Sequence, residues 1–317
     1  MSRQRTFNIV VTEALNDRSM DYLRQHGRVQ MIPIDQLDAA VVDADALVVR
    51  TYTQVTGEVV AKAKRLKVVG RAGVAVDNID LEACRQRGIV VVHTPAANTE
   101  AVVDYTIAHI ILMNRRFLTL TGPVTPERFH QVRKASFGRF LSGLTLGIVG
   151  MGRIGSRVGR AAVALGMKVL TNDIRPVELD YPHQMVDKPA LYAHSDVVTL
   201  HVPLTHLTNH LIDRDALAQF KMGSQFINAA RGPCMDAAAV AEAMRSGRLS
   251  AATIDCHEPE PPPEDYPLWN APNVILTPHS AARVPQAVEN MCNVVYDVVA
   301  VLEGRAPQYP AKGEDEL

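Results

Sequence analysis

The sequence lacks the features that mark secreted, membrane-bound or nucleic-acid-binding proteins. Only four of its 317 residues are cysteines, and they form no CxxC pair and no Cys/His ligand pattern, which argues against a disulfide framework and a structural zinc site. The formal net charge is −1, so nothing attracts the chain generally toward nucleic acid or an anionic membrane. We expect no metal and no nucleic-acid partner, and four buried, reduced thiols at Cys84, Cys234, Cys256 and Cys292.

Long apolar runs are absent as well. The most apolar helical stretch, residues 101–113, is interrupted by Asp104 and His109 and is too short to cross a bilayer. Arg3 and Arg5 near the N-terminus are not followed by an apolar segment of signal-peptide length. The composition, 47% hydrophobic and 21% charged, is that of a soluble globular protein. We therefore expect a cytoplasmic protein without a membrane partner, long enough for two domains.

Short β-branched runs alternate with amphipathic stretches in two parts of the chain, which predicts parallel sheets covered by helices on both faces. A long helix capped by Asn98 or Thr99, and a polar, irregular stretch at 121–142, separate the two parts. The fold class is therefore α/β, with two doubly wound domains. Strands are expected at 9–12, 29–32, 46–50, 67–71, 89–93, 145–149, 168–172, 197–201, 225–228, 252–255 and 274–277, and helices at 20–24, 34–42, 58–63, 81–87, 154–165, 213–220, 237–246 and 285–302.

One glycine pattern carries specific chemistry. Gly150, Gly152 and Gly155 fit G-x-G-x-x-G where a predicted strand meets a predicted helix, the context of a dinucleotide-binding turn. The first glycine permits the tight turn, the second lets the backbone approach a pyrophosphate, and the third lets the helix pack on the strand. The amides of the helix N-terminus, at Arg153 and Ile154, favour phosphate binding.

The next predicted strand ends at Asp173, close to the spacing of about 20 residues expected for the acid that binds a ribose. A carboxylate there accepts both ribose hydroxyls and repels a 2′-phosphate, which favours NAD over NADP. Arg175 lies nearby, and we interpret it as a solvated surface charge.

Polar side chains follow three further predicted strands: Arg231, then Asp255 with Glu260 five residues on, then His279. Open parallel sheets bind ligands at this edge, yet each residue alone also has an ordinary structural explanation. The choice of His279 as a catalyst is weak by residue type, because the chain has 11 histidines. The alternatives are His93, His109, His201 and His257.

Seven segments, in the same order along the chain, resemble the family of D-isomer-specific 2-hydroxyacid dehydrogenases, particularly its 3-phosphoglycerate dehydrogenase branch. The resemblance covers residues 46–279, and the chain ends soon after its final helix, as in the short branch without regulatory domains. The matching segments are VVRTYTQV (48–55), VGRAGVAVDNID (69–80), LGIVGMGRIG (146–155), LHVPLT (200–205), NAARGP (228–233), DCHEPEP (255–261) and TPH (277–279).

The resemblance implies roles for the strand-end residues. His279 would be the general acid/base, Glu260 would orient its ring, and Arg231 would bind the substrate carboxylate. Glu260 is preferred over Glu258 because it aligns without a gap. The cofactor implied is NAD, and its further contacts would be Val202, Ala229, Ala230, Arg231, Asp255 and His279.

The resemblance also implies which residues bind the substrate. Arg50 and Arg71 match arginines near the substrate phosphate in phosphoglycerate dehydrogenases, and the Gly73–Val74 backbone would help to hold the carboxylate. Two arginines in one pocket favour 3-phosphoglycerate, although both could equally serve fold electrostatics. Tyr52 is unexpected beside Arg50.

Two domains, of which the substrate domain is discontinuous, follow from the same resemblance. A substrate domain would span residues 1–98 and 282–317, an NAD-binding domain residues 99–281, and two copies would form a homodimer. The first hypothesis is oxidation of D-3-phosphoglycerate to 3-phosphohydroxypyruvate. The alternatives are reduction of hydroxypyruvate or glyoxylate, oxidation of sulfolactate and, more remotely, a non-catalytic NAD-sensing binding protein.

Overall fold

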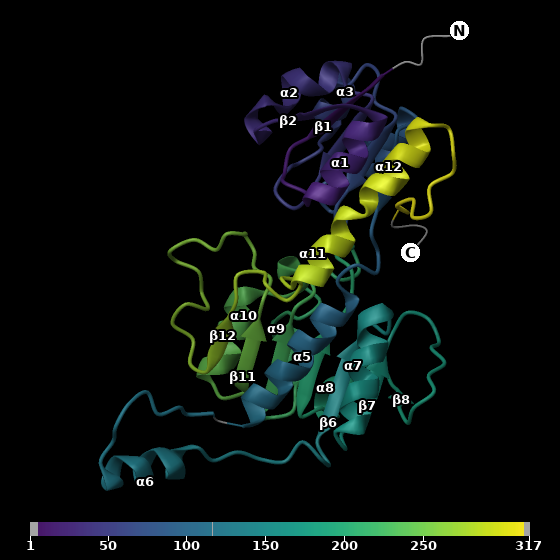
Figure 1. The fold of residues 1–317 in the computed structure, drawn as a ribbon. Helices are drawn as coiled ribbons and strands as arrows, with labels where there is room; N and C mark the ends of the chain where they lie inside the picture. The colour runs from purple at the N-terminus through teal and green to yellow at the C-terminus, as the bar shows by residue number, and fades with distance from the viewer. Residues whose placement is uncertain (1–5, 116, 314–317) are drawn as a thin grey trace. The chain divides into compact units, whose positions relative to one another are not determined.

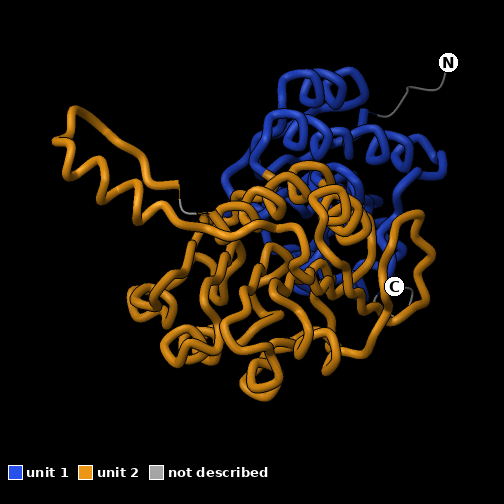
Figure 2. The backbone as a smooth tube through the Cα atoms, turned by 90° about the horizontal axis from the view of Figure 1, so that it is seen from below, with its two compact units in different colours: residues 1–98, 283–317 blue, residues 99–282 orange. Residues whose placement is uncertain are grey.

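The computed structural model describes residues 6–115 and 117–313, so the N-terminal segment with Arg3 and Arg5 lies outside the described residues. The chain divides into two compact units (Figure 2). Unit 1 combines residues 1–98 with 283–317, and unit 2 comprises residues 99–282. The chain thus enters unit 2 at Thr99 and leaves it after Ala282.

Unit 1 contains a five-stranded parallel sheet in the order β2-β1-β3-β4-β5. Helices cover both faces: α1 and α12 pack on one, with Leu23 and Val298 in the core, and α2, α3 and α4 pack on the other, with Val60 and Cys84. Strands buried on both faces are expected to be continuously apolar, as β3 is. The bounds are β1 Phe7–Val11, α1 Asp17–His26, β2 Gly27–Met31, α2 Leu37–Ala40, β3 Ala46–Val49, α3 Gly57–Lys62, β4 Val68–Arg71, α4 Leu81–Gln86, β5 Val90–His93, α11 Pro285–Cys292 and α12 Val294–Leu302.

The last helices complete unit 1 (Figure 1). A Cβ atom on Gly70 of β4 would lie 2.4 Å from Val298 Cγ2 of α12, so this glycine allows the helix to lie directly on the sheet. The predicted single helix at 285–302 is wrong in detail, because Asn293 separates α11 from α12. The predicted helix at 34–42 is likewise divided, into α2 and two flanking 3-10 turns.

Unit 2 contains a seven-stranded parallel sheet in the order β12-β11-β10-β9-β6-β7-β8. Helices α8, α9 and α10 contribute to the hydrophobic core on one face, and α5 and α7 to that on the other. Strand order reverses between β6 and β9, which is where open α/β sheets bind ligands. The bounds are α5 Thr99–Asn114, β6 Thr145–Val149, α7 Arg153–Ala164, β7 Lys168–Asn172, β8 Gln184–Met185, α8 Lys188–His194, β9 Val197–Leu200, α9 Arg214–Gln219, β10 Ser224–Asn228, α10 Ala237–Arg245, β11 Leu249–Ile254 and β12 Val274–Leu276.

A long arm, residues 117–142, extends away from the rest of unit 2 in both views (Figures 1 and 2) and returns at its end, where Arg139 binds Asn114 and Leu141 packs on the core. It carries α6, Pro126–Ala135, where the sequence predicted only irregular structure. The Thr125 side chain caps this helix, and Pro126 occupies its first turn. None of its residues is buried, and its few apolar residues form only a weak amphipathic pattern, too little to predict the helix.

The predicted fold class, two doubly wound parallel sheets, is confirmed. The expected burial of the cysteines is confirmed, and all four are free. No helix in residues 6–115 and 117–313 is long and apolar enough to cross a membrane.

Candidate active site in unit 2 and an arginine pair in unit 1

The glycine turn lies at the point where the strand order of unit 2 reverses. Gly150 has a φ of 92°, a conformation that suits glycine. A Cβ atom there would lie 2.5 Å from the carbonyl oxygen of His201 and 2.8 Å from Cγ1 of Val202, the residues that follow β9. At Gly155 a Cβ atom would lie 2.0 Å from the Gly150 carbonyl oxygen. Only glycine therefore fits at either position, as predicted from the pattern.

The same turn fits a dinucleotide. Gly152 is the N-cap of α7 without a capping side chain, and a Cβ atom on it would meet nothing within 4 Å, so a phosphate can approach the first amides of α7. Arg153 is exposed at the start of that helix, and Ile154 is partly buried. Asp173 accepts the Met151 amide at 2.7 Å and the Arg175 amide at 3.1 Å, which orients its carboxylate toward the turn.

Arg231, Asp255 and His279 follow three neighbouring strands, β10, β11 and β12. Backbone bonds join their ends: the Asp255 amide donates to Asn228, and the His279 amide donates to the Asp255 carbonyl oxygen, each at 2.9 Å. Ala230 is buried and Ala229 partly buried. A Cβ atom on Gly232 would lie 1.9 Å from the His257 carbonyl oxygen, so the turn after Arg231 packs tightly on the segment after Asp255.

The His279 ring binds a carboxylate. Its Nδ1 lies 2.9 and 3.0 Å from the two oxygens of Glu260, which leaves Nε2 for a substrate. The rings of His93, His109 and His257 instead bind backbone carbonyls. Burial lowers the pKa of His201 to about 3, so this fourth alternative stays neutral. Glu258 pairs with His210.

Asp255 is completely buried. Its carboxylate accepts hydrogen bonds from the Thr277 hydroxyl at 2.6 Å and from the Ser280 and Ala281 amides at 2.8 and 2.9 Å. This side chain therefore holds the segment that carries His279, a role that the sequence did not predict.

In unit 1, Arg50 and Arg71 stand at the ends of the neighbouring strands β3 and β4. Arg50 donates to the Ala14 carbonyl oxygen at 2.8 Å, and Arg71 donates to the Ala72 carbonyl oxygen at 3.3 Å. The Arg71 guanidinium lies against Gly73, because a Cβ atom there would overlap its Nη1. The Val74 carbonyl oxygen binds His93 Nδ1 at 2.6 Å. Both arginines are partly buried.

The sequence analysis missed the residue that shapes the Arg50 loop. Glu13, just after β1, accepts the amides of Arg50 at 2.9 Å, Thr51 at 3.1 Å, Tyr52 at 3.2 Å and Thr53 at 3.1 Å. The sequence signal that could have identified Glu13 is its position just after β1, the strand that pairs with β3. Burial alone would raise the pKa of Glu13, but the donors of the loop together lower it.

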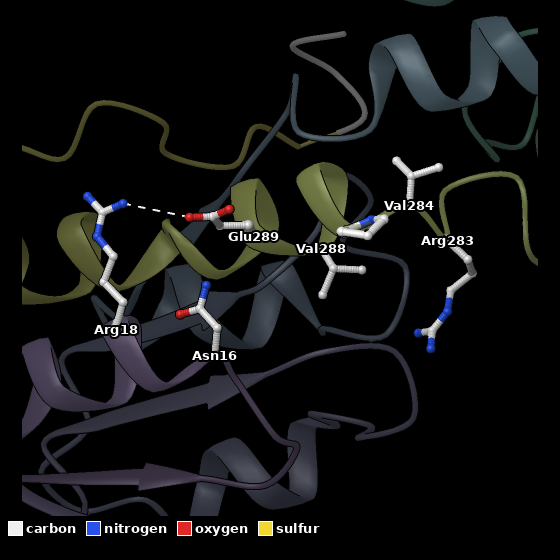
Figure 3. Close-up of a pocket in the computed structure, with 7 residues that line it drawn as sticks. Asn16, Arg18, Arg283, Val284, Val288 and Glu289 are labelled. Atoms are coloured by element: carbon white, nitrogen blue, oxygen red, sulfur yellow. Dashed lines mark ion pairs between the residues drawn. The ribbon is translucent and has the colours of Figure 1, made fainter.

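A separate surface hollow in unit 1 lies beside α1 and α11 (Figure 3). Arg18 and Glu289 approach to 3.8 Å across it, with side chains 69% and 58% exposed. Exposed pairs of this kind contribute little free energy, and we assign the hollow no role.

Residues 107–281 match the family described as D-isomer specific 2-hydroxyacid dehydrogenase, NAD binding domain. The chain belongs to this family. The predicted family and its cofactor, NAD, are thereby confirmed, and the comparisons with individual proteins agree. A D-3-phosphoglycerate dehydrogenase of Archaeoglobus fulgidus is 38% identical over 93% of this chain and 57% of its own length.

Two further similar proteins are named for activities other than phosphoglycerate oxidation. A hydroxypyruvate reductase of Thermotoga maritima is 36% identical over 80% of this chain and 83% of its own length. A D-lactate dehydrogenase of Aquifex aeolicus, solved with NAD and lactic acid, superposes with a TM-score of 0.81 at 28% identity, over 94% of this chain and 96% of that one. The chain spans little more than half of the Archaeoglobus relative, so relatives alone do not identify its substrate.

Proposed function

We propose that the chain is an NAD-dependent oxidoreductase that transfers a hydride between NAD and C2 of a small 2-hydroxy acid. The observation that carries this proposal is the pair formed by His279 and Glu260, on the same sheet edge as Arg231 and within the NAD-binding domain of the family. A proton acceptor, its orienting carboxylate and a guanidinium are the groups that this reaction requires.

Each residue has a defined part in the oxidation. His279 takes the proton of the C2 hydroxyl at Nε2, because Glu260 engages Nδ1, and the carboxylate stabilises the imidazolium that forms. Arg231 binds the substrate carboxylate with two parallel donors and polarises the C2 oxygen. NAD, when bound, would supply the acceptor for the hydride of C2. We assign Gly150, Gly152, Arg153, Ile154 and Gly155 to its pyrophosphate, Asp173 to its ribose, and Val202, Ala229 and Ala230 to its remaining contacts. Asp255, which the sequence placed among these contacts, is completely buried and acts instead on the segment that carries His279.

Within this class we propose D-3-phosphoglycerate as the substrate and 3-phosphohydroxypyruvate as the product. Arg50 and Arg71, at the ends of neighbouring strands, would bind the phosphate, with Gly73 and Val74 beside the carboxylate. The phosphoglycerate dehydrogenase relative, 38% identical over 93% of this chain, supports the choice.

The test is a panel of D-3-phosphoglycerate, hydroxypyruvate, glyoxylate and sulfolactate, each assayed with NAD(H) and NADP(H). We expect the highest kcat/KM for D-3-phosphoglycerate with NAD. Arg50→Ala and Arg71→Ala should each lower it by ~10-fold or more, since a charged hydrogen bond contributes about 1.5–3 kcal/mol. The exposed Arg28→Ala serves as the control. If kcat/KM is unchanged in both variants, the phosphate assignment is wrong.

The second candidate is reduction of hydroxypyruvate or glyoxylate. It is favoured by the hydroxypyruvate reductase relative, of which the chain covers 83%, and by Tyr52, a large side chain that is 77% exposed beside Arg50. The same panel separates the two, because the reductase should prefer the unphosphorylated oxo acid and lose little on replacement of Arg50.

We further propose a homodimer formed through the arm of unit 2. Helix α6 has ten residues and none is buried, and helices of that length are marginal alone. Apolar side chains exposed along one segment generally meet a partner. Those of the arm are Phe117, Leu118, Leu120, Val124, Phe129, Phe137 and Phe140, each at least 40% exposed. We also propose that the enzyme works in the cytoplasm, where free thiols such as these four remain reduced.

A further inference from the structure

A chain of hydroxyl groups leads from helix α5 to the buried Asp255. The Tyr105 hydroxyl lies 2.5 Å from Thr277 Oγ1, which donates to Asp255 Oδ1 at 2.6 Å. Threonine has one hydroxyl proton, and a carboxylate only accepts. Since that proton goes to Asp255, the Tyr105 hydroxyl must donate to Thr277. Burial raises the pKa of Tyr105, so this donor keeps its proton.

Asp255 in turn holds the backbone on both sides of His279. Its carbonyl oxygen accepts the His279 amide at 2.9 Å, and its carboxylate accepts the next amide, of Ser280, at 2.8 Å. His279 has a φ of 51°, in the left-handed region, which is strained for a residue with a side chain and persists only where neighbours enforce it. The two bonds fix the dihedral angles of this residue, and with them the direction of its ring.

The backbone of Thr277 is held by a second set of hydrogen bonds. Its carbonyl oxygen accepts from His257 Nε2 at 2.9 Å, while His257 Nδ1 lies 3.3 Å from the Tyr266 hydroxyl. These bonds hold the Thr277 backbone, whereas its hydroxyl is held by Asp255 and by Tyr105.

We propose that Tyr105 is a positioning residue, which orients the Thr277 hydroxyl and through it Asp255 and the imidazole of His279. Tyr105 touches neither substrate nor cofactor in this proposal. The effect on catalysis depends on the proposed function, whereas the effect on the His279 segment does not.

The experiment compares Tyr105→Phe, Thr277→Val and Thr277→Ser with the wild type. Hydrogen–deuterium exchange is followed in peptides that contain the Ser280 and Ala281 amides, and kcat is measured with D-3-phosphoglycerate and NAD and with hydroxypyruvate and NADH. We expect Tyr105→Phe and Thr277→Val to exchange faster and to lower kcat by roughly 3- to 10-fold, as for the loss of one hydrogen bond. KM should stay within about twofold. Thr277→Ser keeps the hydroxyl and should restore both values.

Tyr192→Phe is the matched control, because the buried Tyr192 hydroxyl has no hydrogen-bond partner among the described residues. If Tyr105→Phe behaves like Tyr192→Phe in both assays, the proposal is overturned. Faster exchange with unchanged kcat overturns the positioning role. If the wild type turns over neither compound, the proposed function has failed, and unchanged exchange would still refute the link between Tyr105 and the His279 segment.

Discussion

Two histidines of unit 2 share an unusual local geometry, and this gives the catalytic assignment its sharpest test. His279 and His210 have φ values of 51° and 47°, and each ring binds a glutamate, Glu260 and Glu258 respectively. Only His279 follows a strand of the sheet edge that carries Arg231 and Asp255. Position in the fold, rather than residue type or pairing, therefore distinguishes the proposed catalyst.

His279→Gln should lower kcat by ~10²–10⁴-fold, the usual contribution of a positioned general acid/base. Glu260→Gln should lower kcat by a smaller factor, because it alters only the partner of the His279 ring. The matched control, His210→Gln, should retain wild-type turnover. Steady-state and single-turnover rates with the best substrate of the panel provide the measurement. A His279→Gln enzyme with more than a tenth of wild-type kcat would contradict the acid/base assignment of His279.

Asp173 should decide the choice between the two nicotinamide cofactors. Asp173→Ala removes the proposed partner of the ribose hydroxyls and the charge that repels a 2′-phosphate, so we expect weaker NAD binding and tighter NADP binding. Dissociation constants from quenching of Trp269 fluorescence or from calorimetry measure both changes. Arg175→Ala serves as the control with NAD. An unchanged NAD/NADP affinity ratio in Asp173→Ala would refute the role.

At the scale of the element, the loop after β3 depends on one carboxylate from the end of β1. Four consecutive amides, from Arg50 to Thr53, point at Glu13. Consecutive amides of this kind form an anion-binding concavity, here filled by the protein itself. The position of Arg50 therefore depends on the ionisation of Glu13.

Glu13→Gln should loosen this loop and lower the free energy of unfolding by about 1–3 kcal/mol near pH 7, as for lost hydrogen bonds to a charged group. The folded-state pKa of Glu13 is lowered from 4.5, so its stabilisation is present above about pH 4.5 and is lost as pH falls through the folded value. Urea unfolding from pH 7 to pH 3 should show the variant and the wild type converging on acidification. The exposed Glu58→Gln is the control, and a pH-independent difference would contradict the explanation.

The sequence predicts best the elements that bury apolar residues. Strands β6 and β7 begin and end at the predicted residues, because each sits among the apolar residues of the core. Helix α6 was missed because it buries nothing, although Thr125 and Pro126 mark its start. The contact between Tyr105 and Thr277 joins residues 172 positions apart, and no local pattern encodes such a pairing.

At the scale of the whole molecule, the arm determines the assembly that we expect. Phe137 and Phe140 are each 83% exposed, and covering such apolar area favours association by ~25 cal/mol per Å². Phe137→Asp with Phe140→Asp should convert the dimer into a monomer in sedimentation or light-scattering measurements. Met222→Asp, a change at a residue that is 64% exposed outside the arm, should leave the dimer intact. A wild-type monomer at micromolar concentration would refute the proposed interface.

The burial of all four thiols makes it easy to label the folded protein with a fluorophore at one chosen site. Burial raises the pKa of the Cys84 thiol to about 11, and Cys256 and Cys292 are no more than 1% exposed, so maleimides should react slowly with the native chain. A single cysteine introduced at the tip of the arm would then be the one fast-reacting nucleophile. A fluorophore attached there would follow association in real time, with little background labelling.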